Sequence, residues 1–115
     1  MNHHKGTRKF GRRSSVRKAL LKSLALSLVV HGKIMTTDAK ARELRPYVEK
    51  MITMGGLSTV ASRRQLASKL GNLGAKKVSI ELSPRYKDRK GGYTRITKLP
   101  RRLSDGSLMS VIEFV

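Results

Sequence analysis

The feature that most limits what this chain can fold into is its excess of positive charge. Its 115 residues contain 26 lysines and arginines against 7 aspartates and glutamates, which gives a formal net charge of +19 at pH 7. Repulsion among so many like charges opposes the compaction of a free protein. We therefore expect a polyanionic partner, with nucleic acid as the first expectation and an anionic membrane surface as the second.

The length and the residue types exclude several classes of protein. A chain of 115 residues can bury one modest core and hardly two. It contains no cysteine, which excludes disulfide scaffolds, thiolate zinc sites and cysteine nucleophiles. The longest apolar run, residues 24–30, is far shorter than the roughly 20 residues that span a bilayer. The sequence thus predicts one small domain without a membrane span.

The first residues predict a basic arm that precedes the domain. Residues 1–13 contain five lysines and arginines and a single large apolar side chain, Phe10, so burial cannot offset the entropy cost of ordering them. We therefore divide the chain into an arm, residues 1–13, and a single domain, residues 14–115. The basic start followed by the apolar residues 20–30 also resembles a secretory signal or an organellar transit peptide. Lys22 interrupts this apolar stretch, which argues against secretion.

Hydrophobic spacing predicts two helices in the first half of the domain. Apolar side chains recur every four residues over residues 14–31, which indicates a helix that the following glycine ends. Residues 33–36 form a short stretch that contains the β-branched Ile34 and Thr36, and we interpret them as a brief strand or an extended link. A second apolar stripe predicts a helix over residues 38–54. Because the stripe keeps its phase across Pro46, we expect a kink there, with a break as the alternative.

The second half of the domain predicts a third helix and a hairpin. We expect Ser58 to cap a helix that runs to about Leu70, with Val60, Ala67 and Leu70 facing inward. Residues 75–86 fit strand alternation and helical spacing equally well, so the sequence leaves this segment open. Residues 93–99 and 108–115 have strand character and an Asp-Gly turn signal lies between them. These elements predict an α+β fold.

The cations gather in two clusters that contain a single acid between them. The first cluster lies in the arm and the first helix and comprises Lys5, Arg8, Lys9, Arg12, Arg13, Arg17, Lys18 and Lys22. The second cluster comprises Arg85, Lys87, Arg89, Lys90, Arg95, Lys98, Arg101 and Arg102. A solvated protein face usually mixes the two signs of charge, whereas guanidinium and ammonium groups of one sign neutralise phosphates. Glycines beside them, Gly91 and Gly92 among them, let backbone amides approach phosphates closely.

No catalytic or metal-binding constellation can be assembled from the sequence. His3 and His4 lie in the arm, where two adjacent imidazoles make a poor chelate, and His31 ends the first helix, where it caps carbonyls or contacts RNA. The carboxylates are scattered singly, whereas a metal-dependent nuclease needs them clustered. We therefore predict a protein that is not an enzyme and that uses no cofactor, no metal and no small-molecule substrate.

Three stretches of the chain resemble the bacterial large-subunit ribosomal protein L17 family. Residues 34–45 read IMTTDAKARELR, and the family shows a closely similar signature. Residues 3–12, HHKGTRKFGR, resemble the basic opening of the family. Residues 91–96, GGYTRI, followed by SDG at residues 104–106 and VIE at residues 111–113, resemble its ending. The matches occur in order and at compatible spacing along nearly the whole chain, although Pro46 interrupts the second helix in a way that the family pattern does not.

The resemblance implies a fold, a function and a location. The fold is an α+β domain in which a helix, a strand, three helices and a β-hairpin close a mixed sheet, which favours helix for residues 75–86. The function is that of a structural constituent of the large ribosomal subunit, which binds large-subunit rRNA near the nascent-chain exit tunnel. The partners are this rRNA and neighbouring large-subunit ribosomal proteins, with no membrane. The location is the ribosome in the cytoplasm, and an organellar ribosome stays open as an alternative.

The clusters and the resemblance together assign a set of RNA contacts. The set is His3, His4, Lys5, Arg8, Lys9, Arg12, Arg13, Arg17, Lys18, Lys22, Lys40, Arg63, Arg64, Arg85, Arg89, Lys90, Gly91, Gly92, Tyr93, Arg95, Lys98, Arg101 and Arg102. The main alternative is a DNA-binding protein that reads base edges with its third helix, where Arg63, Arg64 and Gln65 are the only candidates. A membrane-active cationic helix over residues 14–30 comes third.

Overall fold

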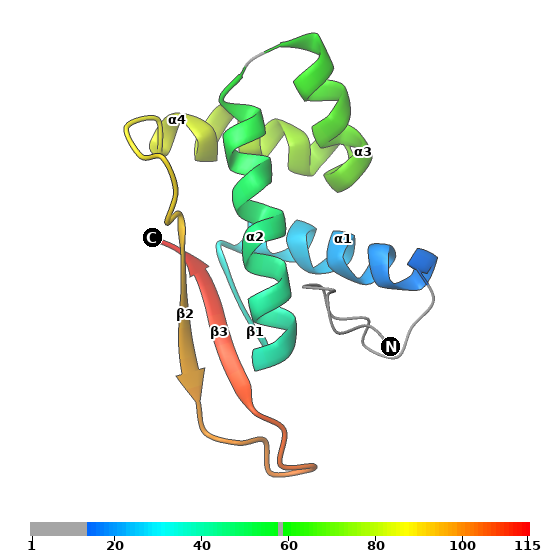
Figure 1. The fold of residues 1–115 in the computed structure, drawn as a ribbon, viewed down its shortest axis with the longest axis vertical. Helices are drawn as coiled ribbons and strands as arrows, with labels where there is room; N and C mark the ends of the chain where they lie inside the picture. Colours follow the sequence, from blue (N-terminus) through cyan, green and yellow to red (C-terminus); the bar gives the residue numbers. More distant parts are fainter. Residues whose placement is uncertain (1–13, 58) are drawn as a thin grey trace, which may run out of the picture.

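The structure, a computed structural model, describes residues 14–57 and 59–115 of the chain. The predicted arm over residues 1–13 and the predicted cap at Ser58 lie outside these residues. The elements follow one another as α1 (Ser14–His31), β1 (Lys33–Thr37), α2 (Asp38–Gly55), α3 (Val60–Lys77), the π-helical segment η1 (Val78–Leu82), α4 (Ser83–Arg85), β2 (Thr94–Leu99) and β3 (Met109–Phe114) (Figure 1).

The three strands form one antiparallel sheet in the order β1-β3-β2. Ile112 of β3 lies at the centre, opposite Ile34 of β1 on one side and Ile96 of β2 on the other. The α+β fold class is confirmed, but the expectation of a mixed sheet is wrong for the strands that the structure describes. The reason is topological, because β1 and β2 run in the same direction but are separated by β3, so neither pairs with the other.

Helix α2 covers one face of the sheet and carries the central part of the core. Its residues Ala41, Leu44 and Val48 are fully buried, as is Ile112 of β3. Figure 1 shows α2 running along the sheet, with α1 extending to one side of it and α3 crossing near its far end. Each buried leucine of this kind contributes about 1.5–3 kcal/mol relative to its exposed state. The apolar stripe predicted for this helix is therefore its packing face.

The start of α2 is fixed by two polar side chains. Thr37 caps the helix, since its Oγ1 accepts a hydrogen bond of 3.4 Å from the backbone N of Lys40. Asp38 is largely buried and accepts a hydrogen bond of 2.7 Å from the hydroxyl of Ser110 in β3, while Arg42 Nε lies 2.9 Å from its other oxygen. The helix continues unbroken through Pro46, so the alternative of a break there is wrong.

The helical region after α2 differs from its prediction at its start. Thr59 is the cap of α3, and Thr59 and Ser62 form a reciprocal capping box with bonds of 3.1 Å in both directions. The predicted cap one residue earlier is therefore wrong, because the buried hydroxyl of Ser62 selects Thr59 as its partner. Val60, expected to face inward, is exposed, and Leu66 is buried in its place.

The segment that the sequence left open is helical. At Gly71 the backbone departs from helical geometry, with φ +79° and ψ 171°, which matches the predicted helix end near Leu70. The chain then resumes as helix and passes through η1 into α4, with Val78 and Leu82 buried in the core. The strand alternative for residues 75–86 is wrong. Within residues 14–57 and 59–115, no helix is long and apolar enough to cross a membrane.

Candidate nucleic-acid interface

The described residues of the first basic cluster and the second basic cluster lie on opposite sides of the domain. The described members of the first cluster, Arg17, Lys18 and Lys22, belong to α1, which extends away from the sheet in Figure 1. The second cluster follows strand β2 along the opposite border, from the loop that precedes the strand to the loop that follows it. Because α2 lies between them, the structure does not bring these three residues of α1 together with the second cluster. The domain therefore presents two separate basic surfaces.

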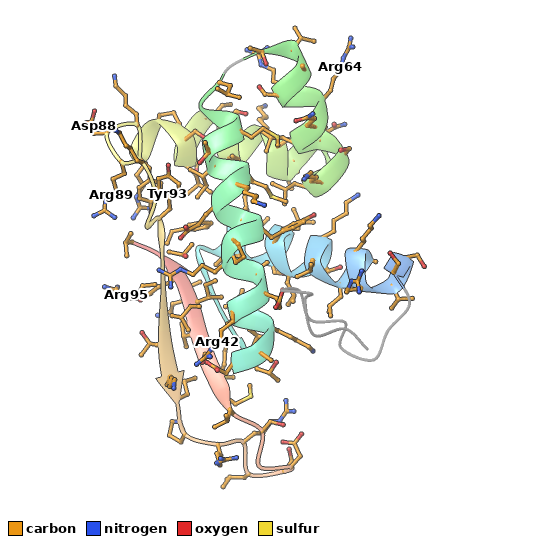
Figure 2. The ribbon with its side chains drawn as sticks, viewed as in Figure 1. Arg42, Arg64, Asp88, Arg89, Tyr93 and Arg95 are labelled. Atoms are coloured by element: carbon orange, nitrogen blue, oxygen red, sulfur yellow. The ribbon has the colours of Figure 1, made fainter. Side chains whose placement is uncertain are left out.

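Strand β2 gives the second cluster a straight, accessible frame. Among the described strands it lies at the edge of the sheet, next to β3 alone, and Arg95 and Lys98 are exposed along it. Arg89 and Arg95 both project at this border of the molecule (Figure 2). Cations on an edge strand also prevent pairing with a strand of another chain. We call the exposed cations from Arg85 to Arg102 along this border the β2 surface.

The loop that leads into β2 is built around two buried tyrosines. The rings of Tyr86 and Tyr93 lie 5.2 Å apart between centroids, tilted by 43°. The hydroxyl of Tyr93 donates a 3.1 Å hydrogen bond to the carbonyl of Arg89, and that of Tyr86 donates to the carbonyl of Val115. Burial raises the pKa of Tyr86, so its phenol remains a donor at neutral pH. Tyr93, assigned as an RNA contact, thus supports the loop from within.

The glycines of this loop set its backbone path. Gly92 has φ +66°, a conformation that side chains rarely adopt. Arg89 Nη1 donates a 3.0 Å hydrogen bond to the carbonyl of Gly92, which closes the loop on itself. Gly91 and Gly92 are both exposed, and no atom lies within 4 Å of where their Cβ would be. Their backbone groups are therefore open to a ligand.

A polar anchor that sequence reasoning missed holds β2 against α2. The carboxylate of Glu49 accepts hydrogen bonds from the backbone N (3.3 Å) and hydroxyl (2.8 Å) of Thr94. Arg45 pairs with the same carboxylate at 3.5 Å and donates to the Thr94 carbonyl at 3.3 Å. The helical spacing of Arg45 and Glu49 hinted at an ion pair. Their partner, 45 residues away from Glu49, left no signal in the sequence.

The arginines of the β2 surface are engaged with the protein itself. Arg95 pairs with Glu113 through bonds of 3.1 and 2.9 Å, and Arg102 grips Asp105 through bonds of 3.0 and 2.7 Å. Arg85 donates to the carbonyl of Val115 at 2.7 Å, and Arg101 to that of Gly106 at 2.9 Å. These groups are oriented by their contacts before any ligand arrives.

The lysines of the same surface differ from its arginines. Lys87, Lys90 and Lys98 are all exposed, and none of them forms an ion pair with a carboxylate in the described part of the chain. A hollow of about 520 Å³ opens beside Lys87 and Arg89, between the loop and the end of α2. The lysines therefore supply charge that no acid of the described domain neutralises.

The remaining assigned residues are spread over the helices. Lys18 and Lys22 are exposed on α1, while Arg17 and, in the first turn of α2, Lys40 are half-buried. Arg63 and Arg64 are exposed on α3, and Arg64 projects from the end of the molecule farthest from Arg42 (Figure 2). His3 to Arg13 lie outside the described residues. Across residues 14–57 and 59–115, no group of three or more His, Asp or Glu side chains could hold a metal ion.

Comparison with known proteins gives the relationship of the chain. Residues 20–115 match the family described as Ribosomal protein L17. The large ribosomal subunit protein bL17 of Sulfurimonas denitrificans is 47% identical over 116 residues, which cover 100% of both chains. That of Persephonella marina is 48% identical over 100% of this chain and 95% of its own. That of Shouchella clausii is 46% identical over 93% of this chain and 97% of its own. With a similar sequence along its whole length and an α+β fold that carries two basic surfaces, the chain belongs to the ribosomal protein L17 family.

Proposed function

We propose that this protein is a structural, non-enzymatic constituent of the large ribosomal subunit that binds large-subunit rRNA. We place it near the nascent-chain exit tunnel, beside neighbouring ribosomal proteins, in the ribosome of the cytoplasm. Family membership supports the proposal, because the relatives are named as proteins of the large ribosomal subunit. The net charge of +19 supports the choice of RNA as the direct partner.

The observation that carries the proposal is the set of cations without acidic partners along the β2 border. Lys87, Lys90 and Lys98 stay exposed, although neighbouring arginines find acids or carbonyls within the domain. Ammonium groups of this kind neutralise phosphates and release the counterions condensed around them. The arginines between them have fixed orientations, so each can offer its remaining N–H groups to a phosphate at low entropy cost.

The separation of the two basic surfaces gives the binding mode. The α1 surface, which we define as the exposed cations Lys18 and Lys22, and the β2 surface lie on opposite sides of α2. One phosphate backbone therefore cannot pass over both without bending around the domain. We therefore assign each surface to a separate segment of rRNA. In this mode the protein ties two RNA segments together, which suits a structural role and needs no catalytic group.

A competition experiment tests the function. The purified full-length protein is bound to labelled large-subunit rRNA, and unlabelled large-subunit rRNA, small-subunit rRNA or duplex DNA is added at equal phosphate concentration. We expect large-subunit rRNA to compete at least tenfold better than the other two, because non-specific phosphate contacts are the same for all three competitors. Equal competition by all three would contradict the proposal, and a preference for the duplex would favour a DNA-binding protein.

A further inference from the structure

The loop between β2 and β3 contains a leucine whose side chain is fully exposed to solvent. This loop, residues 100–108, projects beyond the helices at one end of the molecule (Figure 1). Leu103 lies in this loop with an exposed fraction of 103%, as much as in an extended chain. Leu108, which directly precedes β3, is about half exposed. Folding therefore gives Leu103 no burial at all. Single exposed apolar residues are common on protein surfaces, so the conformation of the loop decides whether this one matters.

The loop is held rigid by its own residues. Arg102 clamps both oxygens of Asp105, and its backbone N donates to the carbonyl of Ser107 at 2.9 Å. The backbone N of Gly106 returns a 2.8 Å bond to the Arg102 carbonyl, at a glycine with φ +70°. Ser107 N donates to Asp105 Oδ1 at 3.1 Å, and Arg101 reaches the Gly106 carbonyl. These contacts fix the tip of the loop, and its end is tied to α2 by a 2.8 Å hydrogen bond from the backbone N of Asp38 to the carbonyl of Leu108.

A loop that is ordered in advance and exposes a leucine lowers the conformational entropy lost when a partner binds. The Asp105 carboxylate, the backbone groups of Arg102 and the backbone N of Gly106 and Ser107 are already paired within the turn, so a partner can displace water from them without leaving them unsatisfied. The backbone that carries Leu103 is ordered in advance, so little conformational entropy remains to be lost on contact. The pKa of Asp105 is held well below its usual range, chiefly by the Arg102 guanidinium. The clamp therefore persists at physiological pH.

The charges around the tip decide what it contacts. Its single acid, Asp105, is taken up by Arg102, and Arg101 and Lys98 remain as exposed cations on either side. An apolar side chain flanked by cations fits a nucleic acid, in which leucine packs against an exposed base while the cations hold the backbone. A protein pocket that accepted Leu103 would also have to accommodate these cations.

We propose that the β2–β3 loop adds to the β2 surface an RNA contact in which Leu103 packs against an unpaired base of the rRNA. Arg101 and Lys98 hold the phosphates beside that base, and the clamp of Arg102 on Asp105 keeps the tip in shape. This contact rests on the proposed rRNA-binding function. It adds Leu103 to the RNA contacts, although an uncharged side chain cannot neutralise a phosphate. It gives the protein a shape-dependent contact in addition to its electrostatic ones.

The first test replaces the exposed leucine. Leu103→Ser should lower the affinity for large-subunit rRNA about five- to tenfold, since an apolar contact to a base is lost. The slope of log K against log salt should stay unchanged, because no charge is removed. Leu73→Ser is the matched control, as Leu73 is also strongly exposed but lies on α3, and it should leave the affinity unchanged.

The second test separates shape from charge. Asp105→Asn raises the net charge by one, so a purely electrostatic tip would bind RNA more tightly. If the clamp orients Leu103, the same substitution should instead weaken binding several-fold. Tighter binding by Asp105→Asn would overturn the inference.

The outcomes distinguish this inference from the proposed function. If the wild-type protein shows no preference for large-subunit rRNA, the proposed function fails. If it shows that preference but Leu103→Ser binds as well as Leu73→Ser, only the inference fails. If Leu103→Ser binds free rRNA normally but dissociates from assembled large subunits, the tip contacts a protein, and the RNA contact is equally overturned.

Discussion

Single residues in the loop before β2 shape the β2 surface without facing solvent. Tyr93 is buried and hydrogen-bonds the Arg89 carbonyl, while Thr94 is fixed by Glu49. We therefore interpret both as positioning residues for the exposed Arg89, Lys90 and glycine backbone. The GGYTRI motif at residues 91–96 assigns these residues to one functional segment. It does not show which of them face RNA. That distinction depends on a contact with Glu49 of α2, which lies 45 residues before Thr94 in the chain.

Two glycines provide a matched test of this loop. Gly92 and Gly32 have φ +66° and +80°, and at neither would a Cβ meet an atom within 4 Å. Gly92→Ala and Gly32→Ala should each lower the free energy of unfolding by about 1–2 kcal/mol, the cost of a left-handed alanine. Only Gly92→Ala should also weaken binding to rRNA, because it shifts the loop that Arg89 closes. Comparable binding by the two variants would show that the path of this loop is irrelevant to RNA.

The elements show where periodicity predicts structure and where it fails. The boundaries of α1, β1, α2 and the hairpin strands could be predicted from apolar spacing and terminating glycines, because each buries one continuous stripe. The helical region from Val60 to Arg85 could be predicted only in part. Val78 and Leu82, the first and last residues of its π-helical segment, are both buried in the core, and their sequence spacing fits a strand as well as a helix.

The β2–β3 loop carries a pH dependence whose direction follows from its ion pair. The pKa of Asp105 lies well below its ordinary value of 3.8 because Arg102, and then Ser107, hydrogen-bond the charged carboxylate. A depressed pKa in the folded state stabilises the protein fully above that ordinary value, and the contribution is lost as the pH falls below it. The effect is small because both groups are exposed to solvent.

Urea unfolding at several pH values measures this dependence. The difference in unfolding free energy between the wild type and Asp105→Asn should be constant from about pH 5 to 8 and shrink below about pH 4. Glu113→Gln is the control, because Arg95 and Glu113 form an exposed ion pair elsewhere in the same hairpin. It measures how the unfolding free energy depends on pH when a different carboxylate is lost. A difference for Asp105→Asn that grows in acid would show that the ion pair affects stability with the opposite sign.

At the scale of the whole molecule, the domain divides its charge between two surfaces. The sequence predicted the two clusters, since the absence of interspersed acids is visible in it. It could not predict that the described cations of α1 and those of β2 lie apart, because that depends on how α1 and β2 pack on opposite sides of α2. Nor could it separate the lysines without acidic partners from the arginines that pair with Asp105 or Glu113. Most individual helices and strands could be predicted from the sequence, whereas their arrangement in space could not.

The central claim is that cations on the β2 surface neutralise rRNA phosphates, and the salt dependence of binding tests it most directly. If six cations take part, the slope of log K against log salt should be about −4 to −5 for the wild type. Replacing Lys87, Lys90 and Lys98 by Gln should make the slope shallower by about 2 to 3. The control variant replaces Lys50, Lys69 and Lys76, three exposed lysines on α2 and α3, and should leave the slope unchanged. A wild-type slope shallower than about −2, or equal slopes for the two triple variants, would contradict the account.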